Sequence, residues 1–251
     1  MVRLIRAEFL KVRTTQVWLW LLLATIAIMA LLVVAQIAPS DGVQRSSEVA
    51  TMFASSATAD IAVFVLGVLG VTTEFRYQTI TPTVLATPSR WALISAKLIT
   101  YAILGAAFAL ISIAVQLAIA LPWLSAKGIH VSLGQDNIPH ALGGVFAVVA
   151  LFGLVGLGVG ALLRNQIVAV SVGLIFILVL QNVLLAIPVV KHAYPFTPGG
   201  AASSILAITQ NDKTPNGVHL LGAGGGIVVL LLWALVPALL GASISMNRDI
   251  T

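Results

Sequence analysis

Three charged side chains, Glu74, Arg76 and Arg90, lie close together in a chain of which only 8% of the residues are charged. They belong to the segment EFRYQTITPTVLATPSR at 74–90, which is polar, contains two prolines and separates two long apolar stretches. Charged groups in such a connection are suited to holding a soluble partner. We therefore predict that residues 74–90 are a cytoplasmic docking element, through which a soluble protein acts on a membrane domain.

Motifs for catalysis are absent from the sequence. It contains no H-E-x-x-H and no G-x-S-x-G, and the glycine-rich stretch GAGGGI at 222–227 has no lysine to hold a phosphate. The chain has no cysteine, which excludes disulfides, thiolate metal sites and a cysteine nucleophile. The sequence predicts a chain that is not an enzyme, binds no metal or cofactor and cannot hydrolyse ATP itself.

The composition is that of a membrane protein. Of the 251 residues 59% are hydrophobic and the mean hydropathy is +1.08, whereas soluble proteins are roughly half apolar and about a quarter charged. A helix needs about 20 apolar residues to cross a bilayer, which leaves room for about six spans and no sizeable soluble domain. We expect an all-α integral membrane protein with a single transmembrane domain over 1–251.

The net charge of +5 arises from basic residues that bracket the apolar stretches instead of forming one patch. This distribution suits anionic lipid headgroups better than nucleic acid. Six spans are predicted at about 17–38, 50–73, 91–121, 141–163, 166–187 and 220–243.

A basic amphipathic helix is predicted over residues 2–15, before the first span. Its apolar side chains, among them Phe9, recur on one face, and basic residues form an adjacent arc. Such a helix lies along the inner membrane surface. The alternative is that these are ordinary positive charges flanking the first span. The residues assigned to this interface helix are Arg3, Arg6, Phe9, Lys11 and Arg13.

Prolines and lysines suggest where the spans end. Pro122 is expected to close the third span, Pro188 to stop the fifth and Pro237 to kink the sixth. Lys97, near the inner end of the third span, is expected to extend its amine to the headgroups. The apolar part of Tyr194–Ile208 is too short to cross, so we expect a re-entrant or interfacial helical segment on the outer side.

The basic residues predict the topology. With both termini in the cytoplasm, nine of them fall inside and four outside, as the positive-inside rule requires. The inner residues are Arg3, Arg6, Lys11, Arg13, Arg76, Arg90, Lys97, Arg164 and Arg248, and the outer ones are Arg45, Lys127, Lys191 and Lys213.

Four residues within the spans are candidates for a translocation path or a seam between two subunits. Asp60 is an acid in hydrocarbon, which favours a functional role, although neighbouring serines and a threonine also permit a wet outer-leaflet position. Gln116 fits hydrogen bonding between helices. Gly156 and Gly160 are four residues apart, a spacing that lets helix backbones approach closely, either within one subunit or across a dimer seam.

The sequence resembles the ABC-2 family of permeases, the membrane subunits of bacterial ATP-binding-cassette transporters. The resemblance is carried by RAEFLKVRTTQVWLWLLL at the N-terminus, by EFRYQTITPTVLATPSR between spans 2 and 3, and by PFTPGG before span 6. It covers essentially the whole chain. The family commonly has Gly where this chain has Gln78. The residues that match the family's loop pattern are Glu74, Phe75, Arg76, Thr79, Leu85, Pro88 and Arg90.

The resemblance implies a dimer of six-helix subunits, an N-terminal interface helix and a coupling helix that sits in a groove of a separate ATPase. Two Thr-Pro pairs, at 81–82 and 87–88, are suitable helix starts. They favour a coupling helix of about 82–86 in a compact elbow. ATP and Mg²⁺ are then expected on the partner ATPase, and the chain in a bacterial inner membrane.

The function expected is therefore export of a hydrophobic or amphipathic cargo, such as a drug, lipid or peptide. An ATP-independent secondary transporter or channel is the alternative, and a membrane anchor for partner proteins is a third possibility. The identity of the cargo is open, and so is the choice between homodimer and heterodimer.

Overall fold

The computed structural model describes residues 1–37, 46–79, 90–128, 131–134, 137–207 and 217–246. Within these ranges the chain is helical and contains no β-strand. Its helices are α1 (Val2–Thr14), α2 (Val17–Ile37), α3 (Ser46–Ala54), η1 (Ser55–Thr58), α4 (Ala59–Arg76), α6 (Arg90–Ala126), α7 (Ile138–Leu163), α8 (Gln166–Ile175), η2 (Phe176–Leu180), α9 (Gln181–Ala186), η3 (Lys191–Phe196), α10 (Pro198–Leu206) and α11 (Gly222–Met246).

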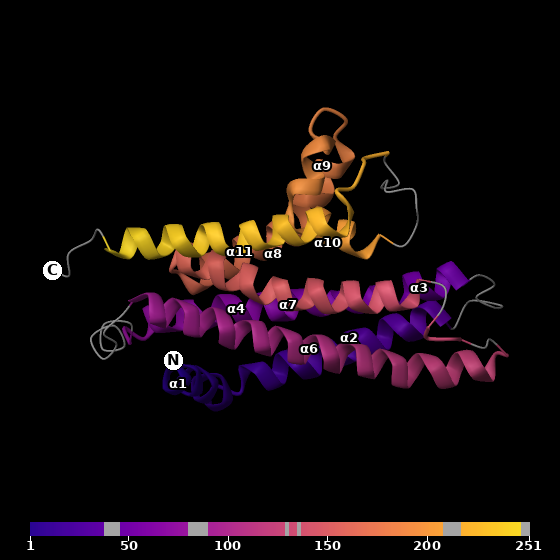
Figure 1. Cartoon of the computed structure of the whole chain (residues 1–251), viewed down its shortest axis with the longest axis horizontal. Coiled ribbons are helices and arrows are strands. Elements are labelled where there is room, and N and C mark those ends of the chain that lie inside the picture. Colours follow the sequence, from indigo (N-terminus) through magenta and orange to yellow (C-terminus); the bar gives the residue numbers. More distant parts are fainter. Residues whose placement is uncertain (38–45, 80–89, 129–130, 135–136, 208–216, 247–251) are drawn as a thin grey trace.

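Six helical stretches of the described chain are long and apolar enough to cross a membrane, which confirms the predicted all-α membrane fold. Except for Gln166–Ala186, which rises away from the others, they run roughly along the length of an elongated bundle (Figure 1). Their bounds are Val17–Ile37, Val49–Arg76, Trp91–Ala126, Ile138–Leu163, Gln166–Ala186 and Gly222–Gly241. We call the end of the bundle that holds α1 and the last turn of α4 the inner end.

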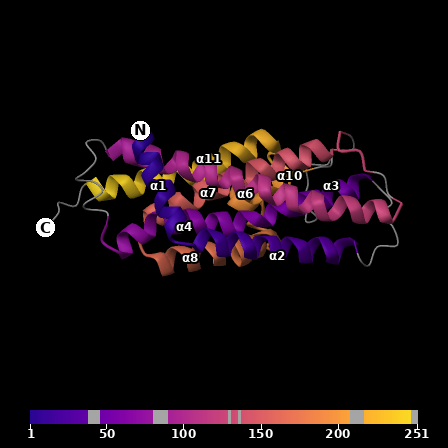
Figure 2. The same ribbon diagram turned by 90° about the horizontal axis from the view of Figure 1, so that it is seen from below.

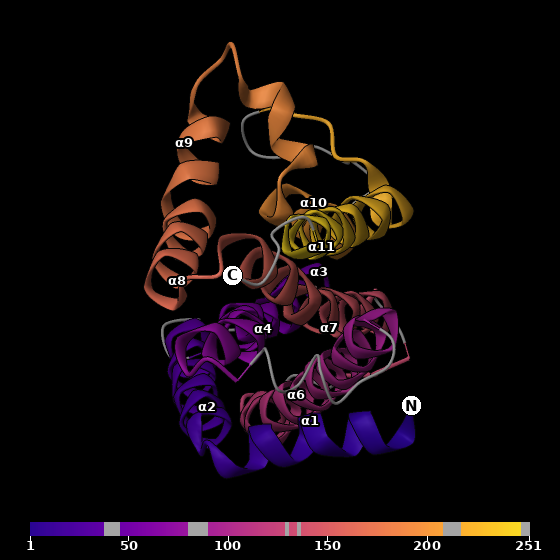
Figure 3. The same cartoon turned by 90° about the vertical axis from the view of Figure 1, so that its left-hand side faces the viewer.

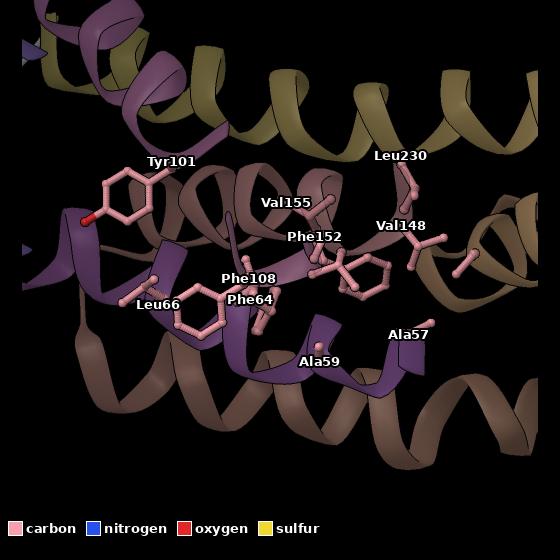
Figure 4. Packing of buried hydrophobic residues seen from close by; sticks show 14 of the residues in the cluster. Ala57, Ala59, Phe64, Leu66, Tyr101, Phe108, Val148, Phe152, Val155 and Leu230 are labelled. Carbon is pink, nitrogen blue, oxygen red and sulfur yellow. The ribbon is translucent and has the colours of Figure 1, made fainter. Parts of the chain in front are cut away.

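Helix α7 lies at the centre of the bundle and packs against α4, α6 and α11 (Figure 3). The larger hydrophobic core forms around it, with Phe64, Tyr101 and Phe152 among its buried members (Figure 4). A smaller, separate core, which includes Phe53 and Leu124, joins the carboxyl ends of α2 and α6 to α3 and the start of α7. The bundle therefore has two packing units along its length.

Helix α1 lies across the bundle instead of along it (Figures 2 and 3). It contacts the first turns of α2 and the inner part of α6. Its outward stripe contains Arg3, Arg6 and Arg13, all exposed. This orientation suits a helix in the plane of the membrane surface, as predicted for an interface helix.

Span 2 is not one continuous helix, although the sequence predicted a single span. A 3₁₀ segment, η1, interrupts it between α3 and α4. The carbonyl of Met52 accepts hydrogen bonds from the hydroxyl of Ser55 (2.6 Å) and from the Gln116 amide of α6 (2.6 Å). Side chains thus satisfy backbone groups where the helical ladder breaks.

The prediction that Pro122 closes span 3 is wrong, because α6 continues through it to Ala126. Proline removes one backbone donor and strains the preceding turn. The last turn is nevertheless held in place, because Leu124 is fully buried in the smaller core. Packing here outweighs the local preference to stop.

Span 5 is built from α8, the π-helical segment η2 and α9, and it leans away from the bundle (Figures 1 and 3). Beyond it, η3 and α10 form the short segment predicted before span 6. The Gln181 side chain accepts from the Gly199 amide of α10 (3.0 Å), and the Trp233 indole of α11 donates to the Phe196 carbonyl (2.8 Å). These contacts tie the outer part of span 5 to α10 and α11.

Candidate functional site

The last turn of α4 carries three consecutive side chains, Glu74, Phe75 and Arg76, that reach three different neighbours. Successive residues of a helix point about 100° apart. Glu74 therefore faces α1 and α6, Phe75 lies against Arg164 of the turn between α7 and α8, and Arg76 reaches α8. One helical turn thus contacts most of the inner end of the bundle.

Glu74 belongs to a closed ring of four charges, formed with Glu8 and Lys11 of α1 and Lys97 of α6. We call these four residues the charge ring. The Lys11 amine donates to Glu8 Oε1 (2.8 Å) and to Glu74 Oε1 (2.7 Å). The Lys97 amine donates to Glu8 Oε2 (2.9 Å) and to Glu74 Oε1 (2.7 Å). Acids and lysines alternate, so the net charge of the ring is zero.

Three members of the charge ring are buried, with exposed fractions of 3% for Glu8, 4% for Glu74 and 6% for Lys97. A buried charge is tolerated when its partner is present, and loss of one partner leaves the other charge uncompensated. The expectation that Lys97 extends to the headgroups is therefore wrong. Two carboxylates hold its amine inside the bundle, and the Gly70 carbonyl accepts a further, longer hydrogen bond (3.3 Å).

Lys11 is the most exposed member of the ring, with 44% of its side chain accessible. Burial lowers the pKa of Lys11, but hydrogen bonds and charge from Glu74 and Glu8 raise it more. The net effect is a pKa above the ordinary value of 10.5. Lys11 therefore stays protonated under physiological conditions.

The other side of the turn is held by Arg164, which sequence reasoning treated only as an inner positive charge. Arg164 ends α7 in the left-handed conformation, with φ 55°. Its guanidinium donates to the Gly241 carbonyl of α11 (2.9 Å) and lies 5.7 Å from the centroid of the Phe75 ring. Beside it, Arg76 donates to the Gln166 side chain of α8 (3.2 Å).

The chain leaves α4 through a well-defined helix cap. The Gln78 amide donates to the Phe75 carbonyl (3.3 Å) and the Thr79 amide donates to the Glu74 carbonyl (3.0 Å). This pair of bonds is the Schellman arrangement, which needs a left-handed residue. That residue is Gln78, with φ 55°, and the conformation explains why a glycine is suited to this position.

The structure describes only some of the remaining predicted coupling residues. Thr79 is exposed at the end of the cap. Leu85 and Pro88, together with the coupling helix expected at about 82–86, lie outside the described residues. Arg90 begins α6, but only its backbone is described.

In α1, the three arginines assigned to the interface helix are exposed and Phe9 is half-buried, whereas Lys11 turns toward the charge ring. Glu8 was missed as a site residue. Its signal was its i, i+3 spacing to Lys11 on a helix of mixed character, which is also common on ordinary solvated surfaces.

The polar candidate path residues, Gln116 and Asp60, differ in burial and in surroundings. Gln116 is buried and hydrogen-bonded at the break in span 2, whereas Asp60 is half-buried in the first turn of α4. Within the described chain, the amide oxygen of Gln116 and the hydroxyl of Ser112 are buried without a hydrogen-bond partner. The polar groups of this region thus mark the helix break more clearly than a binding site.

Gly156 and Gly160 pack within the chain. A Cβ at Gly156 would overlap the Phe64 carbonyl of α4, and one at Gly160 would lie 2.8 Å from the Val68 carbonyl. Of the two readings open from sequence, close packing inside one subunit describes these glycines in this structure. They are not available to a second copy.

No metal site is evident in the part of the chain that the structure describes, where groups of three or more suitable His, Asp or Glu side chains do not occur. The contacts at the inner end can transmit movement from one helix to another. Ion pairs, a cation–π contact and hydrogen bonds connect the end of span 2 with α1, α6, α8 and α11.

Comparison with known proteins identifies the family. The family model described as ABC-2 family transporter protein matches residues 4–182, which is more than half of the chain. The match includes most of α1, the whole charge ring, the 74–90 segment and Arg164. A search among curated proteins gives no match.

Proposed function

Because this chain belongs to the ABC-2 family of transporter proteins, we propose that it is the permease subunit of an ATP-driven exporter. A separate ATPase subunit binds ATP and Mg²⁺ and supplies the work. Two permease subunits, identical or paralogous, form the working dimer. The complex lies in a bacterial inner membrane with both termini of this chain in the cytoplasm.

One observation carries this proposal beyond family membership: the connections made by the last turn of α4. Force applied to the 74–90 segment would enter the bundle through Glu74, Phe75 and Arg76. From there, described contacts lead to α1 and α6 on one side and to α8 and α11 on the other. A loop that served only as a connection would not need this set of contacts.

The mechanism we propose uses these contacts. Closure of the ATPase subunits on ATP pushes on residues 74–90 and tilts spans 2 and 3. The buried contacts at the inner end spread the tilt to neighbouring helices, and the change alters access at the seam between the two permease subunits.

The cargo we propose is hydrophobic or amphipathic, such as a drug, a lipid or a peptide. The spans carry few fixed charges, which would suit such a molecule better than a sugar or an ion. Large apolar side chains also face outward along span 5, including Ile167, Val172 and Leu178. A lipid-soluble cargo can approach the protein along such surfaces from within the bilayer.

The test uses the permease reconstituted with an ABC ATPase that co-purifies with it. Arg76→Ala, and separately replacement of residues 85–88 by a Gly-Ser linker, should lower stimulation of ATP hydrolysis at least tenfold. Lys191→Ala, in η3 after span 5, is the matched control and should leave stimulation unchanged, because Lys191 lies outside the 74–90 segment and outside the charge ring. Both inner-end variants should still be inserted and monodisperse.

Two results would contradict the proposal. ATPase binding and stimulation that survive both inner-end changes would show that residues 74–90 do not couple. Cargo movement by the purified permease without any ATPase would favour the ATP-independent transporter or channel instead.

A further inference from the structure

We infer that Glu8 and Lys97 are positioning residues for coupling, which make α1 part of the same moving unit as the inner ends of α4 and α6. The inference rests on the proposed function and deepens it. Neither residue belongs to the 74–90 segment, and neither needs to touch the ATPase. They act through Glu74, the residue from which the segment departs.

The geometry gives Glu74 two separate links. Its side-chain carboxylate closes the charge ring, with one oxygen, Oε1, accepting from both Lys11 and Lys97 at 2.7 Å. Its main-chain carbonyl accepts the Thr79 amide in the helix cap (3.0 Å). The same residue therefore joins the ring to the start of the docking segment, so a shift of either is felt by the other.

The charge ring also constrains the position of α1 when α4 moves. Helix α1 crosses the bundle, and Glu8 is its most deeply buried charged residue. If α4 and α6 shift together while α1 stays, the two ion pairs that cross to α1, Lys11–Glu74 and Lys97–Glu8, must open. Opening them exposes charges to a low-dielectric surrounding, which is strongly unfavourable. Movement of the three helices together avoids this.

The alternation of charges makes the inference specific. Every acid of the ring contacts both lysines, so reversal of any single member creates two like-charge contacts. Exchange of one acid with one lysine also leaves two like-charge contacts. Only reversal of all four members restores four attractive pairs, which a general effect on stability would not require.

The first experiment measures coupling in the reconstituted complex with its ATPase. Glu8→Gln and Lys97→Met should still bind the ATPase but should lower the ratio of cargo moved, followed with a fluorescent amphipathic dye as the probe, to ATP hydrolysed at least tenfold. The fourfold variant E8K/K11E/E74K/K97E should recover that ratio to within about threefold of wild type. Lys191→Met is the matched lysine control and should have no effect.

These readouts separate the two proposals. If the wild-type permease fails to bind or stimulate the ATPase, the proposed function fails. If it couples normally and the folded single variants keep the wild-type ratio, the role of Glu8 and Lys97 is overturned while the proposed function stands.

A second measurement keeps the ring intact, so it does not depend on whether the single variants fold. The chain has no cysteine, so spin labels can be placed at exposed Leu10 of α1 and Ile99 of α6 by Leu10→Cys and Ile99→Cys, with cysteines of the ATPase replaced. The distance between the labels should be the same with and without a non-hydrolysable ATP analogue. A shift or broadening on nucleotide binding would show that α1 moves separately and would overturn the inference.

Discussion

At the residue scale, Glu74 shows that burial can change the role expected of a charged side chain. From sequence it was the first residue of a polar segment and a candidate contact for a soluble partner. In the structure its carboxylate is turned into the bundle and bonded to lysines from two other helices. In the proposed docking its contribution is therefore indirect, through the position it gives to the residues that follow.

Lys11 permits a test of the charge ring by pH. Because its pKa is raised in the folded protein, the stabilisation is fully present below about pH 10.5 and is lost as pH rises through the folded-state pKa. Solvent screens this partly exposed lysine, so Lys11→Met should lower the free energy of unfolding by only about 1 kcal/mol or less. The difference from wild type should be constant between about pH 6 and 9 and should shrink above about 10.5.

Thermal unfolding in detergent across this pH range provides the measurement. A difference between wild type and Lys11→Met that opens or closes between about pH 6 and 9 would contradict this account, because the lysine does not titrate there.

Sequence reasoning found the charged segment but not its partners. Glu8 and Lys97 are separated from Glu74 in the chain, and each has an ordinary explanation as a surface or snorkelling charge. The pairing of these charges depends on how α1 crosses the bundle and on how α6 packs against α4. The local spacing of residues in the sequence predicts neither arrangement. Arg164 was missed as a site residue for the same reason.

At the scale of elements, hydropathy located all six membrane-crossing stretches, because each needs a long apolar run. The interruptions were less predictable. The 3₁₀ break in span 2, the π segment in span 5 and the passage of α6 through Pro122 depend on contacts with other helices. Local propensity is a weak guide where tertiary packing supplies or withdraws hydrogen-bond partners.

The contact between α4 and α7 gives an element-scale prediction. Gly156→Ala should lower the free energy of unfolding by about 1–3 kcal/mol, because the added methyl group overlaps the Phe64 carbonyl and pushes the helices apart. Gly143→Ala is the matched control in the same helix, since a Cβ there meets no atom within 4 Å. Thermal unfolding of the two purified variants compares them directly, and equal stability would refute the packing argument.

At the scale of the whole molecule, the distribution of basic residues predicts which end of the bundle faces the cytoplasm. Exposed Thr14, the last residue of α1, lies at the inner end, whereas exposed Ser125 lies near the carboxyl end of α6, at the other end of the bundle. In intact cells, a membrane-impermeant thiol reagent should label Ser125→Cys and should label Thr14→Cys only after permeabilisation. Labelling of Thr14→Cys in intact cells, with Ser125→Cys labelled only after permeabilisation, would show that the topology is inverted and that the charge ring faces outside.

Because η1 interrupts span 2, we expect the span to bend more easily there than within α3 or α4. Backbone hydrogen bonds stiffen α3 and α4, whereas side chains of other helices supply bonds at the interruption: Gln116 of α6 donates to the Met52 carbonyl, and Gln36 of α2 donates to the Ser55 hydroxyl. The segment η1 also lies near the boundary between the two hydrophobic cores. We therefore expect bending to cost least at 55–58, so that in the proposed coupling a push delivered at Glu74 would swing α4 while α3 stays packed in the smaller core.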